Sequence, residues 1–134
     1  MRRFHLLFGA TVVFVFVLTG QYMDRFHNHL EGLADGPRML YRSRHIYVLL
    51  AGLVHLALGA YLAPRRDAAA RALQLVGSGV LVFATPLLVA AFFLEPPASD
   101  LENVPYSRAG LYLAAAGTVA HVLSGVRSGK DGPS

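Results

Sequence analysis

Long stretches without a charged residue alternate with short charged segments along this chain, and their spacing predicts four membrane-spanning helices. The uncharged stretches cover residues 4–23, 45–63, 72–94 and 109–126. About 20 apolar residues in an α-helix cross the hydrocarbon core of a bilayer. The alternation of apolar and polar residues that marks a membrane β-barrel strand is absent. We therefore expect an all-α, polytopic membrane protein, a four-transmembrane-helix bundle that forms one domain.

The segments between these stretches are short. They cover residues 24–44, 64–71 and 95–108, and a polar tail follows at residues 127–134. Only the first connection is long enough to hold structure of its own. The opening Met1-Arg2-Arg3 and the apolar run after it are similar to a secretory signal, but the run exceeds the usual length of about 7–15 residues and has no clear small-x-small cleavage site. We expect residues 4–23 to be an uncleaved first span.

The distribution of Lys and Arg predicts that both termini face the cytoplasm, since cytoplasmic loops carry an excess of these residues. With the N-terminus inside, the inner side holds seven of the 12 Lys and Arg residues and the outer side five. The inner set is Arg2, Arg3, Arg65, Arg66, Arg71, Arg127 and Lys130, and the outer set is Arg25, Arg38, Arg42, Arg44 and Arg108.

The composition of the chain excludes several classes of protein. Of the 134 residues, 54% are hydrophobic and only 15% charged, whereas a soluble domain carries roughly 25% charge. The chain has no Cys, which excludes disulfides, thiol catalysis and a Cys-based zinc site. We find no nucleophile elbow, phosphate loop, metalloprotease helix or dinucleotide fingerprint, and therefore expect no enzyme activity. The net charge of +4 comes from Arg at the span ends, which is typical of membrane proteins and does not indicate nucleic-acid binding.

Small residues recur at helical spacing within the spans. Helices in lipid associate through close contacts of such residues, so this pattern predicts tight helix packing or an oligomeric contact. Thr85-Pro86 predicts a bend in the third span, because Pro lacks one backbone donor. The candidate packing residues are Gly52, Gly59, Gly77, Gly79, Gly117, Ala120 and Ser124.

Two histidines, His55 and His121, lie well inside predicted spans, where ionisable groups usually face a protein interior, a cavity or a ligand. Counted from the adjacent span ends, they lie at similar depths of about 13 and 9 Å. One hypothesis is a b-type haem held between the two imidazoles. The other is that each ring bonds to a polar group on a neighbouring helix, with no bound cofactor.

Three further histidines, His27, His29 and His45, lie in or beside the first connection, and form a possible site for Cu, Zn or Ni. The alternative is a solvated loop with scattered histidines. Arg38, Arg42 and His45 would share one stripe if the second helix extends outward, with Arg44 beside them. We expect the arginines to contact anionic lipid or a partner, or to pair with nearby carboxylates.

Two stretches, YRSRHIYVLLAGLVHLALGAYL and GSGVLVFATPLLVAAFFLEPP, resemble small uncharacterised four-span inner-membrane proteins of Gram-negative bacteria. The resemblance covers about residues 15–125. It implies a four-helix membrane fold and an inner-membrane location, and it implies no activity or functional residue.

We expect a non-enzymatic integral membrane protein, an accessory or scaffold subunit that contacts lipid and packs with itself or with a larger membrane complex. The first alternative is a small haem-binding electron-transfer protein that uses His55 and His121. The second is a small transporter or channel, for which Pro86 and the polar residues Gln74, Ser78 and Thr85 are the candidates.

Overall fold

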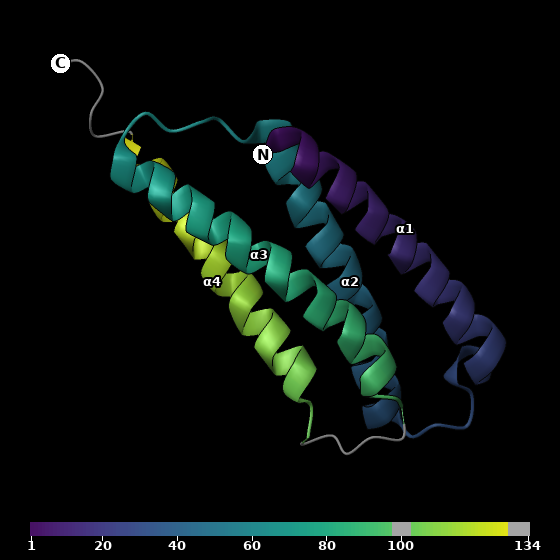
Figure 1. The fold of residues 1–134 in the computed structure, drawn as a ribbon. Helices are drawn as coiled ribbons and strands as arrows, with labels where there is room; N and C mark the ends of the chain where they lie inside the picture. The colour runs from purple at the N-terminus through teal and green to yellow at the C-terminus, as the bar shows by residue number, and fades with distance from the viewer. Residues whose placement is uncertain (98–102, 129–134) are drawn as a thin grey trace.

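Four α-helices form a bundle in the computed structural model, which describes residues 1–97 and 103–128 (Figure 1). The helices are α1 (Arg2–His27), α2 (Asp35–Tyr61), α3 (Ala68–Leu94) and α4 (Pro105–Ser128), and a 3₁₀ turn, η1 (Asn28–Leu30), follows α1. Each of the four is long and apolar enough to cross a membrane. The expectation of an all-α bundle is confirmed, and the described residues contain no strand.

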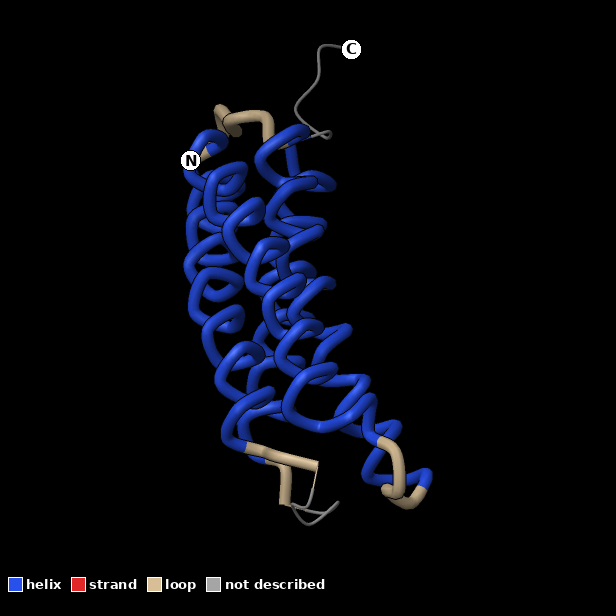
Figure 2. Tube along the Cα trace, turned by 90° about the vertical axis from the view of Figure 1, so that its right-hand side faces the viewer, coloured by secondary structure: helices blue, strands red, loops and turns tan. Residues whose placement is uncertain are grey.

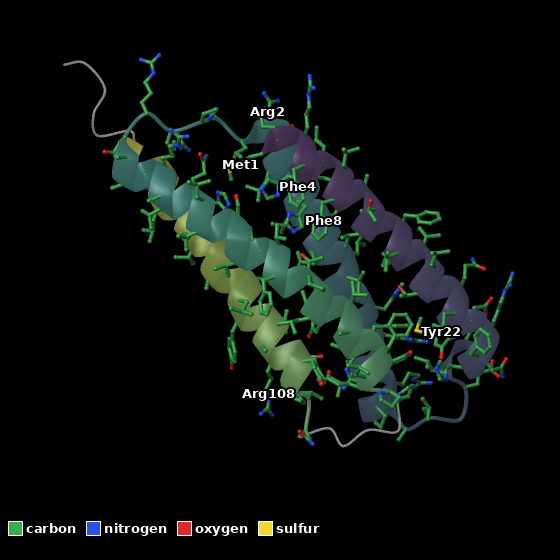
Figure 3. All side chains as sticks on the ribbon, viewed as in Figure 1. Met1, Arg2, Phe4, Phe8, Tyr22 and Arg108 are labelled. Carbon is green, nitrogen blue, oxygen red and sulfur yellow. The ribbon has the colours of Figure 1, made fainter. Side chains whose placement is uncertain are left out.

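The helices run side by side and alternate in direction, so the connections gather at two opposite ends (Figure 2). The N-terminus, the α2–α3 connection and the end of α4 lie at one end, which we call the N-terminal end; the other is the far end. Met1 and Arg2 lie at the N-terminal end and Arg108 at the far end (Figure 3). Residues 98–102 and the part of the expected tail from residue 129 onward, with Lys130, lie outside the described residues.

Helix α2 begins at Asp35, whereas the uncharged stretch begins only at His45. Asp35 lies in the first turn, where a negative charge is favourable, and Pro37 is tolerated there because the first N–H groups of a helix have no partner within it. Arg38 forms an ion pair with Asp35 one turn away. The expected outward extension of the second helix is therefore present, and most of the expected loop is helical.

The helices pack as two close pairs, α1 with α2 and α3 with α4, and glycine permits the closest approaches in each. A Cβ atom at Gly9 would lie 2.8 Å from the backbone nitrogen of Leu56, and one at Gly59 would lie 2.6 Å from that of Leu6. A Cβ atom at Gly77 or at Gly117 would lie 2.9 Å from the carbonyl oxygen of the other. Such contacts hold helices together in lipid, where there is little hydrophobic driving force between them.

The structure places most of the expected packing residues at contacts within the chain. Gly52 faces Val13 on α1, and a Cβ atom at Gly77 would lie 3.1 Å from Cβ of Ala120. Gly79 departs from the expectation, because it faces outward and nothing would lie within 4 Å of a Cβ atom there. Ser124 is buried, and its hydroxyl has no hydrogen-bond partner. Since Gly117 and Ala120 are occupied by the α3–α4 contact, they are not free to form an oligomeric surface.

The interior has three layers between the two ends. Histidines and hydroxyl groups form the layer toward the N-terminal end. An apolar cluster of Val12, Val48, Ala51 and Leu88 follows. Toward the far end, Leu30, Tyr41 and Phe92 pack together beside a buried ion pair. The apolar cluster therefore separates two polar layers.

Candidate functional site: a chain of buried histidines

Two imidazole rings from neighbouring helices meet inside the bundle. His5 on α1 and His55 on α2 are each 1% exposed. Their Nδ1 atoms lie 2.8 Å apart, and the rings stack with centroids 5.0 Å apart. Phe8 packs edge-on against His55 and shields the pair. The close packing of Gly9 and Gly59 brings the two backbones near enough for this contact.

Hydroxyl groups of α3 extend this pair in both directions. Nε2 of His5 lies 3.1 Å from Oγ of Ser78, which in turn lies 3.2 Å from Nε2 of His121 on α4. On the other side, Nε2 of His55 lies 3.0 Å from Oγ1 of Thr85. We call these five residues the histidine chain. The histidine chain joins all four helices. Because a polar group without a hydrogen bond is costly in a membrane interior, these contacts stabilise the bundle.

The direction of every hydrogen bond in the histidine chain follows from one hydroxyl group. Thr85 donates its only hydroxyl hydrogen to the carbonyl oxygen of Leu81 at 2.9 Å. Its oxygen must therefore accept from Nε2 of His55, which leaves Nδ1 of a neutral His55 as an acceptor. His5 then donates from Nδ1, so its Nε2 accepts.

The remaining bonds are fixed in the same way. Since Nε2 of His5 accepts, Ser78 must donate its hydroxyl hydrogen to it. The oxygen of Ser78 then accepts from Nε2 of His121. With all three rings neutral, His5 carries hydrogen on Nδ1, and His55 and His121 carry it on Nε2. These tautomers are assigned from the hydrogen-bond network.

The structure does not arrange His55 and His121 as the axial pair of the haem hypothesis. The two rings belong to one hydrogen-bonded chain, but Ser78 and His5 lie between them. Both ring nitrogens of His55 are engaged, one by His5 and the other by Thr85. An axial ligand needs a free ring nitrogen. Haem binding at His55 therefore requires one of these bonds to break.

Two of the pockets that adjoin the histidine chain lie beside α4. One, of about 490 Å³, lies between α2, α3 and α4 and is apolar apart from His55, Thr85 and Thr118. The other, of about 380 Å³, is lined mostly by apolar side chains of α2 and of the α2–α3 connection, and its polar members include His121, Gln74 and Arg65 of that connection. Because that connection lies at the N-terminal end, the second pocket leads from this end to His121.

A buried ion pair stabilises the far end. Arg44 is 1% and Glu95 2% exposed, and Nε of Arg44 lies 3.1 Å from Oε2 of Glu95. Glu95 also caps the start of α4, since the N–H groups of Tyr106 and Ser107 donate to Oε1 at 2.7 and 3.2 Å and the Ser107 hydroxyl donates to Oε2 at 2.5 Å. The expectation that Arg44 contacts lipid or a partner is wrong, because the side chain is internal and neutralised by Glu95.

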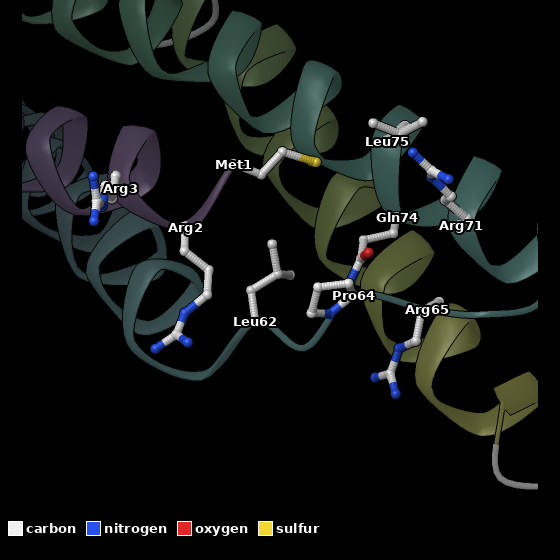
Figure 4. Close-up of a pocket in the computed structure, with 9 residues that line it drawn as sticks. All are labelled: Met1, Arg2, Arg3, Leu62, Pro64, Arg65, Arg71, Gln74 and Leu75. Carbon is white, nitrogen blue, oxygen red and sulfur yellow. The ribbon is translucent and has the colours of Figure 1, made fainter.

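The other two arginines of this stripe lie nearer the surface. Arg38 pairs with Asp35, which is the carboxylate-pairing alternative, and Arg42 is exposed. A larger arginine group lies at the N-terminal end, around a pocket of about 570 Å³ (Figure 4). The arginines that line it are Arg2, Arg3, Arg65 and Arg71. The guanidinium group of Arg2 is already engaged, because it donates to the carbonyl oxygens of Gly59 and Ala60 at the end of α2.

The structure does not bring His27, His29 and His45 together as a metal site. His45 lies 3.1 Å from the Thr19 hydroxyl through Nδ1, whereas His27 packs against aromatic rings. His29 pairs with Asp24 at 2.5 Å. Within residues 1–97 and 103–128, no three or more His, Asp or Glu side chains form a group that could hold a metal ion.

Sequence reasoning missed two parts of this interior. His5 lies in the first turns of α1, close to a span end. Its burial depends on the register of α1 against α2, which the sequence does not give. The apolar pattern assigns Glu95 to a connection, although it follows an apolar span at the same end of the bundle as Arg44. That shared end was a usable signal, because a buried charge needs an opposite partner.

The fold and the site together define a polytopic four-helix membrane bundle with a histidine chain in its interior. Comparisons with known protein families, with curated proteins and with solved structures gave no match.

Proposed function

We propose that the chain is a non-enzymatic integral membrane protein that serves as an accessory or scaffold subunit in the bacterial inner membrane, with both termini in the cytoplasm. The observation that carries this proposal is the engagement of the interior side chains with one another. Buried imidazole, hydroxyl, guanidinium and carboxylate groups bond across helices and stabilise the bundle. Such contacts fix helices relative to one another and need no substrate.

The outward faces support a role in assembly. Phe14 and Leu7 on α1 and Tyr112 and Val122 on α4 are exposed, and less than a fifth of the apolar window of either helix is buried within the chain. These surfaces contact lipid or another membrane protein. The resemblance to small inner-membrane proteins supports the location, and the excess of Lys and Arg at the N-terminal end supports the orientation.

Counting subunits in native membranes tests this proposal. The chain, fused to a fluorescent protein, is extracted directly into lipid nanodiscs and its bleaching steps are counted. We expect two or more copies per particle, or one copy in a particle of larger mass with a constant second component. Single copies without a further component would contradict the assembly role.

The haem alternative has its own test. Protein purified from haem-replete cells would show a Soret band, and both His55→Ala and His121→Ala would abolish it. The engagement of both nitrogens of His55 favours a colourless protein. The transporter alternative needs a polar path through the bundle, and the apolar cluster around Val48 and Leu88 separates the two polar layers.

A further inference from the structure

We propose that the histidine chain is a proton relay, which takes up one proton at His121 from the N-terminal end and stores it on His55. This function goes beyond the accessory role and does not depend on it. The ligand is a proton delivered by water or by a small acid in the pocket beside His121. Three observations carry the inference: the pocket, the uniform direction of the hydrogen bonds, and the apolar cluster beyond His55.

Entry at His121 follows from the geometry of the α3–α4 contact. Its Nε2 donates to Ser78, so the lone pair of a neutral ring lies on Nδ1. His121 is also only partly buried, unlike His5 and His55, and it lines the pocket of about 380 Å³ with Arg65 and Gln74. It is therefore the ring of the histidine chain that a proton from the N-terminal end meets first.

Each transfer along the histidine chain moves one hydrogen and leaves the number of protons balanced. A proton binds Nδ1 of His121, and that ring passes its Nε2 hydrogen to Ser78. Ser78 passes its own hydroxyl hydrogen to Nε2 of His5, and His5 passes its Nδ1 hydrogen to Nδ1 of His55. His55 then carries hydrogen on both nitrogens, and the positive charge has moved from α4 to α2.

A charged His55 has an acceptor for each of its two N–H groups. Its Nε2–H donates to Thr85, and its new Nδ1–H donates back to Nδ1 of His5, which has become an acceptor. Both N–H groups of the imidazolium are thus hydrogen-bonded, as a buried cation requires. His121 lines its pocket together with the cationic Arg65, which repels a positive charge on that ring.

The charged and titratable groups around the relay belong to the N-terminus, α1, α2, the α2–α3 connection and α4. His5 and the N-terminal amine belong to α1 and the residue before it, His55 to α2, Arg65 to the α2–α3 connection and His121 to α4. From α3, Ser78 and Thr85 contribute hydroxyl groups. The permanently cationic groups, the N-terminal amine and Arg65, lie at the N-terminal end.

The relay ends at His55. Thr85 directs its hydrogen to the carbonyl oxygen of Leu81, which has no hydrogen to pass on. Beyond it lie Val48, Ala51 and Leu88 of the apolar cluster. The proton is therefore held within the bundle and returns by the route it entered.

Nuclear magnetic resonance of the full chain, labelled with ¹⁵N at histidine and held in lipid nanodiscs, tests this relay. The protonation of each ring nitrogen is read at neutral pH and during acidification, with signals assigned by single His→Gln variants. At neutral pH we expect hydrogen on Nδ1 of His5 and on Nε2 of His55 and His121. On uptake of one proton, His5 changes to Nε2–H and His121 to Nδ1–H, while His55 becomes imidazolium.

Ser78→Ala tests the link between His121 and the other two rings. In this variant we expect His121 to become the imidazolium, while His5 keeps its hydrogen on Nδ1. Ser124→Ala makes the same chemical change at a buried serine outside the histidine chain and should behave as the unmodified protein. Hydrogen on Nε2 of His5 at neutral pH, or an imidazolium at His121 in the unmodified chain, would overturn the relay. The measurement on the unmodified chain does not depend on Ser78→Ala, so it stays decisive if that variant does not fold.

Proton flux into liposomes tests where the relay ends. The chain is reconstituted into vesicles that contain a pH-sensitive dye, and an acid step is applied outside. We expect no sustained acidification beyond that of protein-free vesicles, because His55 is a terminus. Sustained flux that Ser78→Ala abolishes would show passage across the membrane and would overturn storage on His55.

Discussion

We predict that the two residues of the Arg44–Glu95 ion pair contribute unequally to the stability of the bundle. Nε of Arg44 lies 3.1 Å from the carboxylate of Glu95, and Nη1 donates to the main-chain carbonyl oxygen of the same residue, so the positive charge depends on Glu95. The carboxylate of Glu95 also accepts three hydrogen bonds from the start of α4. Removing the negative charge should therefore be more harmful than removing the positive one.

Magnitudes for the variants follow from this difference. Glu95→Gln leaves Arg44 as a buried uncompensated charge and weakens the cap of α4, and we expect a loss of about 3–5 kcal/mol in the free energy of unfolding. Arg44→Met leaves a carboxylate that still accepts three hydrogen bonds at a helix N-terminus, and we expect a loss of about 1–3 kcal/mol. The double variant removes both charges and should be no less stable than Glu95→Gln alone.

Equilibrium unfolding in mixed micelles, at increasing fractions of a denaturing detergent and followed by circular dichroism, measures these differences. Arg42→Met is the matched control, because Arg42 is exposed on the same helix, and its effect should stay within about 0.5 kcal/mol. The reasoning is refuted if Arg44→Met is the more destabilising single variant. It is also refuted if the double variant loses the sum of the two single losses, since charges in contact must be coupled.

Three further substitutions test the packing and the hydrogen bonds. Gly117→Ala should lower the free energy of unfolding by about 1–3 kcal/mol, because the new Cβ atom would lie 2.7 Å from Cγ of Leu81. Gly79→Ala is the control and should be neutral or slightly stabilising, because Gly79 faces outward. Equal effects of the two substitutions would contradict the assigned contact. Thr85→Val should destabilise by about 1–3 kcal/mol because it removes the hydroxyl group that accepts from Nε2 of His55. Thr118→Val should change stability little, because the exposed hydroxyl of Thr118 bonds to Ala114 of its own helix. Arg2→Gln removes the donors to the carbonyl oxygens of Gly59 and Ala60 at the end of α2, and should increase hydrogen exchange at the amide of Leu62 about 5–10-fold. An unchanged exchange rate would show that these two hydrogen bonds do not stabilise the end of the helix.

The apolar pattern was sufficient to predict the four helices. The charged residues that flank each span indicate where the chain leaves the hydrocarbon core. They do not terminate the helices. Helix α2 accordingly continues outward through Arg38 and Arg42, which are good helix formers. Counting residues predicts similar depths for His55 and His121, and the structure joins the two rings in one hydrogen-bonded chain.

The partners within the interior could not be predicted, because they depend on register and rotation. The contact of His5 with His55 requires α1 to slide to a position set by Gly9 and Gly59. The pairing of Arg44 with Glu95 joins residues that are 51 positions apart, and only the packing of α2 against α3 brings them together. Such long-range contacts leave no local periodicity in the sequence.

Alternating passage of the chain through the bilayer is the central claim, and labelling of single cysteines tests it most directly. The chain has no Cys, so Arg3→Cys, Ala34→Cys, Arg66→Cys and Asn103→Cys can each be probed alone with a membrane-impermeant thiol reagent. We predict that the reagent labels the cysteines at 34 and 103 in intact spheroplasts and those at 3 and 66 only after the membrane is opened. Labelling of the cysteines at 34 and 66 from the same side would contradict the four-span fold.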